Sequence, residues 1–482
     1  MKREGGKNYG RAAALITGLA LIILFGLVPP PEGLNHVSMQ VVGIFAGTIV
    51  LWLGVSTDWP SLVCMLALIG FGIVAPDSAF ATFLGNSTCA FLVFSYTLAD
   101  GLTESGVLRR LAVRAVGMSF VRGHPWRLIL MLVAVGVLIS LVIIPSTMII
   151  ILLPVIEQIF ESCGLHKRSK LTECVVLAVA FAGSIAQGMT PIGHAHPLIA
   201  LSLLQQETGY AVSYFDFMLF AIPTGLVAII LMMLYFRFIV KPDVSALEHV
   251  CQTEPLGPMT ARERFSLWVF IAVVAWWIAP GLLSGIAPEA ANLIGSWGNA
   301  VPAMLGTSML CIIPVDGAPI IKLGKAAKNV PWPVVFMVGA TMVLSSALTG
   351  EKAGITAWIG EMVSEQAASI SAFAIVAITV VWTILQTNFS SNAVSAALVY
   401  SIMVPISMLA GGRINSYALA AVIGSASCYA FATPLSTAVV AIACGTKWVS
   451  GEGTWKHGLV MMLVGVALLI FVGYPLAKIL IV

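Results

Sequence analysis

Two stretches that combine Gly, Pro and polar side chains interrupt long apolar segments of this chain. The first, residues 183–199, runs Gly-Ser-Ile-Ala-Gln-Gly-Met-Thr-Pro-Ile-Gly-His-Ala-His-Pro-Leu-Ile, and the second covers residues 424–439. Because apolar residues flank both, we expect them at membrane depth, where irregular backbone is tolerated only if protein buries it or it lines a cavity. Transporters interrupt helices in this way to direct helix N-termini and free carbonyl groups at a substrate and its ions. The pair therefore predicts one binding site built from two broken helices.

The composition is that of an integral membrane protein with many spans. Of the 482 residues, 59% are hydrophobic and 9% are charged, whereas soluble domains carry roughly 25% charged residues. The eight Cys show no metal-site or disulfide spacing, so we expect neither disulfides nor a thiolate metal site. The basic N-terminus and first apolar run fit a signal peptide or a retained helix, and Pro-Pro-Pro in place of a cleavage site favours the helix.

The apolar segments divide the chain into two similar halves. Single helices are expected near residues 12–28, 39–55, 60–75, 81–102, 214–239, 266–283, 292–313, 331–349 and 456–481. Broken helices are expected over 171–204 and 416–446. The blocks 128–160 and 371–410 are too long for one span and short for two, which favours re-entrant hairpins, with two thin full spans as the alternative. Accordingly we expect an N-terminal helix in 1–36, repeats over 37–240 and 265–482, and a cytoplasmic linker over 241–264.

The positions of Lys and Arg indicate the orientation. If both long blocks return to the face from which they enter and the N-terminus is cytoplasmic, 21 of the 24 Lys and Arg residues lie inside, as the positive-inside rule requires. Each half then holds five spans and a hairpin, and an odd number of crossings inverts the second copy. The predicted fold is an all-α inverted repeat of eleven helices and two hairpins in the inner or plasma membrane, with the C-terminus outside.

Charged side chains are absent from the centre of every expected span. An anion there would be held by amide, hydroxyl, backbone and His groups, and a buried carboxylate relay, as in a sodium/proton antiporter, is not expected. The basic residues Arg109, Arg110 and Arg114 fall on an expected interfacial helix after the fourth span, where a basic face typically meets lipid headgroups.

At motif level the chain resembles the divalent anion/sodium symporter family, which includes dicarboxylate, citrate and sulfate carriers. The first stretch matches the family's first broken helix at Ser184, Ile185, Thr190, Ile192, Gly193, Leu198 and Ile199, whereas His194-Ala-His196-Pro197 replaces its Thr-Pro-Pro-Asn. The second stretch resembles the family at Ala432-Thr433-Pro434. Ser391-Asn392-Ala393 keeps most of the family's Ser-Asn-Thr hairpin tip, but Pro145-Ser146-Thr147 has no Asn.

The resemblance implies both a site and a function. It implies substrate contacts from Ser146, Thr147, His194, His196, Ser391, Asn392, Thr433, Pro434 and Ser436, and Na⁺ ligands from Ser146, Thr190, Gly193, Asn388, Asn392 and Ala432. It also implies secondary transport of di- or tricarboxylates, or of sulfate, by sodium symport or by anion exchange. The carrier would be a homodimer with an elevator motion, with Na⁺ as its only possible cofactor and no nucleic-acid partner.

Other interpretations of these residues remain open. Polar side chains in spans often only join helices, and Ser and Thr satisfy backbone freed by Pro. His194 and His196 fit anion ligands, protonation switches, packed neutral side chains or part of a metal site. A metal-dependent membrane hydrolase is therefore the alternative of another class, although neither a Gly-x-Ser-x-Gly nor a His-Glu-x-x-His motif occurs. A channel is the third possibility.

Overall fold

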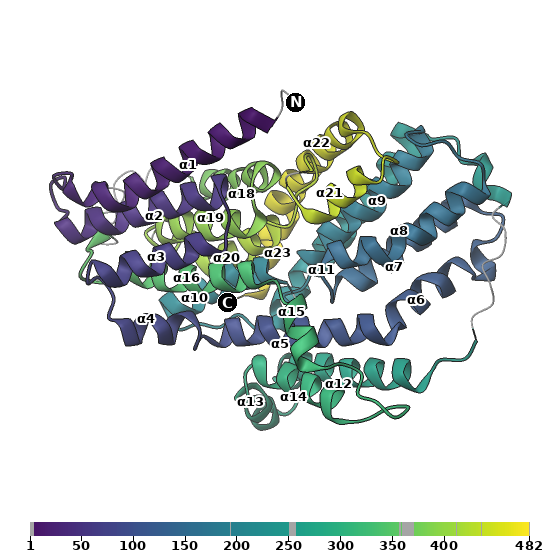
Figure 1. The fold of residues 1–482 in the computed structure, drawn as a ribbon, viewed down its shortest axis with the longest axis horizontal. Helices are drawn as coiled ribbons and strands as arrows, with labels where there is room; N and C mark the ends of the chain where they lie inside the picture. Colours follow the sequence, from purple (N-terminus) through teal and green to yellow (C-terminus); the bar gives the residue numbers. More distant parts are fainter. Residues whose placement is uncertain are drawn as a thin grey trace.

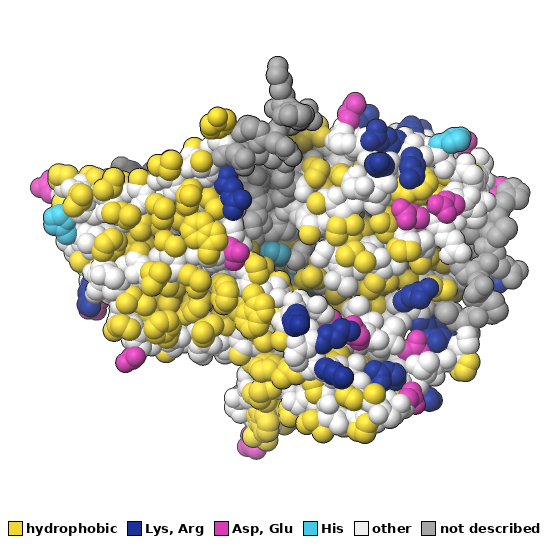
Figure 2. All heavy atoms as spheres, in the orientation of Figure 1, with side chains coloured by type: hydrophobic (Ala, Val, Ile, Leu, Met, Phe, Trp, Pro, Cys, Tyr) yellow, Lys and Arg dark blue, Asp and Glu magenta, His cyan; other side chains and the backbone are white. Residues whose placement is uncertain are grey.

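The computed structural model describes residues 4–192, 194–249, 257–355, 358, 371–410, 412–434 and 436–481, and these residues form helices without a strand. Ten helices in this part of the chain are long and apolar enough to cross a membrane. Hydrophobic side chains cover a wide face over α1–α4, and Lys and Arg gather on the opposite half (Figure 2). This confirms the all-α membrane fold, while the inverted repeat stays a prediction.

The first half begins with α1 (Glu4–Leu24), α2 (His36–Gly54), α3 (Trp59–Gly70), α4 (Pro76–Phe83), α5 (Ser87–Ser105) and α6 (Val107–Val116). The helix expected over 81–102 is split into α4 and α5. The split follows from Asn86, whose side chain accepts a hydrogen bond from Thr88 N at 2.7 Å and so starts a new helix.

The long block of the first half reverses direction between α7 (Pro125–Ser140) and α8 (Pro145–Ser162), which lie side by side (Figure 1). The turn occupies residues 141–144, before the Pro-Ser-Thr interruption at which we expected it. Pro145 does not break a helix because it stands at the first helical position, where no backbone N–H is needed. The half continues through α9 (Lys170–Gln187), α10 (Ala195–Thr208) and α11 (Tyr214–Leu234), which a π-helical turn extends to Val240.

The second half follows a similar order. It begins with α12 (Ala261–Leu283), α13 (Pro288–Gly295), α14 (Ala300–Ile312), α15 (Leu323–Asn329) and α16 (Trp332–Thr349). The capping box of Thr260 and Glu263 ends the linker a few residues earlier than expected. The span expected over 292–313 is two helices, because Gly298 with a φ of 66° turns the chain between α13 and α14.

The closing elements are α18 (Ala372–Phe389), α19 (Asn392–Met408), α20 (Ser416–Ala426), α21 (Ala438–Gly445), α22 (Gly451–Leu468) and α23 (Tyr474–Leu480). Helix α9 lies at the centre of the molecule, since 89% of its apolar window is buried, against 17% for α1 at the edge. Helices α12–α14 pack against α5 along one side (Figure 1). The central position of α9 brings the end of the first broken helix into the protein interior.

Candidate functional site

The N-termini of four helices open onto one cavity of about 330 Å³. Helices α8 and α19 start at the turns of the two hairpins, and α10 and α21 start after the two interruptions. The lining residues from these four starts are Ile144, Pro145, Ser146, Ala195, His196, Ser391, Asn392, Ser436, Thr437, Ala438 and Val439. Tyr96 of α5, Gln187 of α9, and Pro331 and Val334 at the start of α16 complete the described lining. Each half of the chain thus contributes one hairpin and one interrupted helix.

The electrostatics of this cavity come from the backbone rather than from charged side chains. The described residues that line it include no Lys, Arg, Asp or Glu. The start of a helix carries unpaired N–H groups and about half a positive charge, so four such starts create a positive potential without a basic residue. An anion is the ligand that this arrangement favours.

The two interrupted helices touch each other at the level of the backbone. A Cβ added at Gly424 of α20 would stand 2.9 Å from Pro197 Cα, and one added at Gly188 would stand 2.8 Å from the carbonyl oxygen of Ser425. No side chain other than hydrogen fits at either position. Glycine is therefore required where the two breaks meet.

The two histidines of the first break have different surroundings. His196 is half-buried, lines the cavity and has its Nδ1 2.8 Å from Gln187 Nε2. Since the amide nitrogen donates this bond, a neutral His196 carries its proton on Nε2. His194 is fully buried, lies outside the cavity lining and donates from Nε2 to the carbonyl oxygen of Ser140 at 2.7 Å. Only His196 is placed to contact a solute.

Asn388 at the end of α18 holds the second break in place. Its Oδ1 accepts from Phe431 N at 2.7 Å and Ala432 N at 2.8 Å, and its Nδ2 donates to the carbonyl oxygens of Ile384 and Tyr429, both at 2.8 Å. These four bonds use both lone pairs and both protons of the carboxamide. The side chain is therefore fully engaged with the backbone around it.

Three oxygen atoms meet beside the second hairpin turn. Thr387 Oγ1 lies 2.6 Å from the carbonyl oxygen of Ser427 and 2.9 Å from Asn392 Oδ1. The hydroxyl has a single proton for these two acceptors, so the cluster holds more oxygen lone pairs than donors. Such a set of carbonyl, amide and hydroxyl oxygens suits a small hard cation.

The remaining predicted residues lie around the cavity rather than in its lining. Thr147 is half-buried in the first turn of α8. Thr190 Oγ1 donates to the carbonyl oxygen of Leu141 at 2.6 Å, and Thr433 Oγ1 donates to that of Asn388 at 2.7 Å. Pro434 is exposed, and Gly193 lies outside the described residues.

Some lining residues were not among those expected from the sequence. Gln187 lies inside the first polar stretch, where a lone carboxamide beside two histidines was an available signal. Thr437 follows the second stretch's polar residues directly and had a similar signal. Tyr96 and Val334 belong to ordinary apolar helices, and nothing in their local sequence distinguishes them.

Curated relatives match this chain over nearly its whole length. A sodium-dependent dicarboxylate transporter, SdcS of Staphylococcus saprophyticus, is 23% identical over 98% of this chain and 92% of its own. SdcS of Staphylococcus aureus shows the same identity and coverage. A membrane protein of Cupriavidus necator is 20% identical over 95% of this chain and 90% of its own.

A solved structure and a family profile agree with these relatives. The YdaH transporter of Alcanivorax borkumensis aligns with a TM-score of 0.57 at 14% identity, over 90% of this chain and 98% of that one, which supports the fold alone. The profile of the sodium:sulfate symporter transmembrane region matches residues 10–482. These matches confirm the family resemblance and contradict the hydrolase hypothesis. The chain therefore belongs to the sodium:sulfate symporter family and is a multi-pass membrane transporter, not an enzyme.

Proposed function

We propose that the protein is a secondary active transporter that couples uptake of a small dicarboxylate to Na⁺. The observation that carries this proposal is the convergence of four helix N-termini on a cavity whose described lining has no charged side chain. The names of the SdcS relatives support the same substrate class and the same ion.

In this proposal the carboxylates bind the N–H groups at the four helix starts and the polar side chains beside them. Ser146, Ser391, Asn392 and Ser436 supply hydroxyl and amide groups, and His196 donates from Nε2 because Gln187 occupies its Nδ1. Thr147, Thr433 and Pro434 support these residues from behind. His194 acts as a brace for the first break.

The size of the cavity favours a dicarboxylate over sulfate. A volume of about 330 Å³ corresponds to roughly eleven water molecules at about 30 Å³ each. A four-carbon dicarboxylate fills more of this space than a single tetrahedral oxyanion and presents a carboxylate to helix starts from both halves. Sulfate is the competing substrate in the test below.

We place the coupling Na⁺ in the second half, at the oxygens of Thr387, Asn392 and Ser427. In the first half, the carbonyl oxygens of Ser140 and Leu141 already accept bonds from His194 and Thr190. We therefore propose one Na⁺ in the second half, with Asn388 and Ala432 shaping its surroundings, and no Na⁺ at Ser146, Thr190 or Gly193.

The larger-scale features complete the proposal. We propose an inverted repeat, a homodimer and an elevator motion in which the two hairpins, the two broken helices and their closing helices α11 and α22–α23 move together. The N-terminus would be cytoplasmic and the C-terminus outside. Gly188 and Gly424, where the two breaks meet without intervening side chains, support movement of this group as one unit.

Uptake into proteoliposomes tests the proposal directly. Radiolabelled succinate should accumulate when an inward Na⁺ gradient is imposed and should not accumulate with choline in its place, and unlabelled succinate inside should stimulate exchange. Labelled sulfate is measured in parallel. Succinate uptake that ignores Na⁺ would contradict the coupling, uptake of sulfate alone would contradict the substrate class, and absence of counterflow would indicate a channel.

A further inference from the structure

A second cavity, of about 320 Å³, lies where α5, α6, α7 and α12 meet. Apart from two arginines, its described lining is apolar, with Leu102, Leu108, Leu138 and Phe270 each contributed by a different helix. Its volume falls in the range of roughly 300–1,000 Å³ that small-molecule pockets occupy. The proposed transport mechanism makes no use of this cavity.

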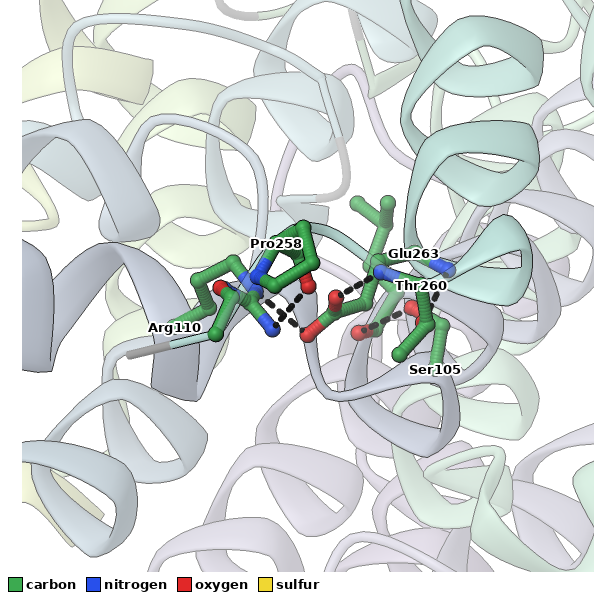
Figure 3. Close-up of polar contacts among 7 residues, drawn as sticks. Ser105, Arg110, Pro258, Thr260 and Glu263 are labelled. Carbon is green, nitrogen blue, oxygen red and sulfur yellow. Dashed lines mark hydrogen bonds and ion pairs between the residues drawn. The ribbon is translucent and has the colours of Figure 1, made fainter. Parts of the chain in front are cut away.

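One of the two arginines is fully occupied by the protein. Arg110 Nε donates to Glu263 Oε1 at 2.7 Å, while Nη1 donates to the carbonyl oxygen of Gly257 at 2.6 Å and Nη2 to that of Pro258 at 3.2 Å (Figure 3). Glu263 in turn accepts from the backbone N–H of Thr260 at 2.8 Å. This network joins α6 to the start of α12 and leaves no guanidinium nitrogen of Arg110 without a partner.

The other arginine is available. Arg114 lines the cavity one turn further along α6, is exposed, and makes neither an ion pair nor a hydrogen bond with any residue that the structure describes. Arg109 is also exposed on α6, but it is not part of the cavity lining. The cavity thus combines an apolar interior with one free cation at its edge.

The cavity also adjoins the turn of the first hairpin. Leu138, Ile139 and Val142 line it, and they flank Ser140 and Leu141 in the sequence. The carbonyl oxygens of the latter two accept the hydrogen bonds from His194 and Thr190 that hold the first break. A ligand in the cavity would therefore pack against the segment that fixes the candidate substrate site.

We propose that this cavity binds one acyl chain of an anionic membrane phospholipid, whose phosphate pairs with Arg114. An amphiphile matches both parts of the cavity, because its chain fills the apolar interior and its phosphate accepts charge-assisted hydrogen bonds from a guanidinium. The buried apolar face of α6, formed by residues such as Leu108 and Ala112, and its exposed arginines fit a helix at the membrane surface, where such headgroups are found.

Native mass spectrometry of the purified full-length protein tests this proposal. The protein is delipidated and titrated with palmitoyl-oleoyl phosphatidylglycerol or with the matching phosphatidylcholine. We expect one phosphatidylglycerol to bind more tightly than phosphatidylcholine. Arg114→Gln should weaken its binding about tenfold, as loss of a charge-assisted contact requires, and Arg114→Lys should restore part of it. Arg109→Gln is the matched control and should change binding less than about twofold.

A second pair of variants tests the acyl chain. Leu138→Trp fills the cavity and should abolish the single bound lipid, whereas Leu130→Trp adds the same bulk on α7 away from the cavity and should not; both leucines are about half exposed, at 54% and 49%. Equal losses for Arg114→Gln and Arg109→Gln, equal binding of the two lipids, or retention of the lipid by Leu138→Trp would each overturn the proposal. Because binding is measured without transport, the outcome does not depend on the proposed function.

Discussion

The hydroxyl of Thr433 donates a hydrogen bond to the main-chain carbonyl of Asn388, with 2.7 Å between Oγ1 and the oxygen. His194 makes the corresponding bond in the first half, from Nε2 to the carbonyl oxygen of Ser140, also at 2.7 Å. Each bond ties a broken helix to the end of the first helix of its hairpin. The imidazole thus performs in one half the task that a hydroxyl performs in the other, which explains a buried His at this position without a role in binding.

The two histidines should separate by the property that their loss affects. His194→Ala removes a buried hydrogen bond and leaves a void, so it should destabilise the protein by about 2–4 kcal/mol. His196→Ala removes a donor to the solute and should raise the KM for succinate about tenfold while leaving the melting midpoint near that of the parent. Thermal unfolding and uptake kinetics of both variants check this, and a reversed pattern would exchange their roles.

Asn388→Ala should be the most destabilising single change around the candidate site. It leaves the buried N–H groups of Phe431 and Ala432 without acceptors, which costs about 3–5 kcal/mol. Gln386→Ala, in the same last turn of α18, serves as the control because its half-buried side chain has no such role. We expect a lower unfolding midpoint and lost uptake only for Asn388→Ala; normal stability would show that the carboxamide is not a brace.

Thr387→Val should act on the ion rather than on the fold. The substitution keeps the shape of the side chain but removes one of the three clustered oxygens, so the Na⁺ concentration for half-maximal uptake should rise at least about tenfold. Thr383→Val is the matched control, since its hydroxyl bonds only to Thr379 of its own helix. An unchanged Na⁺ dependence in Thr387→Val would remove the cation from this position.

Asn392→Ala should abolish succinate uptake while the protein remains folded in the membrane. Asn392 starts α19, lines the cavity and contacts Thr387, so its amide serves both the solute and the ion. Size-exclusion profile and melting midpoint should stay close to the parent, because a cavity-lining amide braces no other backbone group among the described residues. Full uptake by this variant would exclude it from the site.

Glu207 provides a prediction away from the cavity. Its carboxylate accepts from Tyr400 of α19 at 2.9 Å and from Ser345 of α16 at 3.1 Å, and so joins α10 to both helices. Tyr400→Phe should cost about 1.5–3 kcal/mol, as expected for a hydrogen bond to a charged group. Chemical or thermal unfolding in detergent measures the loss, and a stability equal to the parent would show that the bond contributes nothing.

Much of the fold followed from the sequence because apolar runs and Pro or Gly interruptions report directly on membrane helices. The positions of helices and of both chain reversals were predicted well, but Pro145 was placed in a turn when it begins a helix. The spans 81–102 and 292–313 were predicted as single helices, since the effect of Asn86 and Gly298 depends on backbone geometry that an apolar average does not show.

The candidate site was predictable only in part. Polar residues in the two breaks and at the hairpin turns carried a visible signal, and Ser146, His196, Asn392 and Ser436 do meet at one cavity. Which of two histidines two residues apart faces that cavity depends on the path of irregular backbone. Tyr96 reaches it from a continuous helix, where only tertiary packing selects one aromatic residue from many.

The glycine contacts between the two interruptions have a mechanical consequence. At Gly188 and Gly424 the chain segments cross with no side chain between them, and a single methyl group would already collide with main-chain atoms. Sliding or prying these segments apart would open a void that neither could fill. Any route by which a solute reaches the opposite face must therefore carry this crossing intact, like cargo locked inside a moving carriage rather than passed through a swinging door.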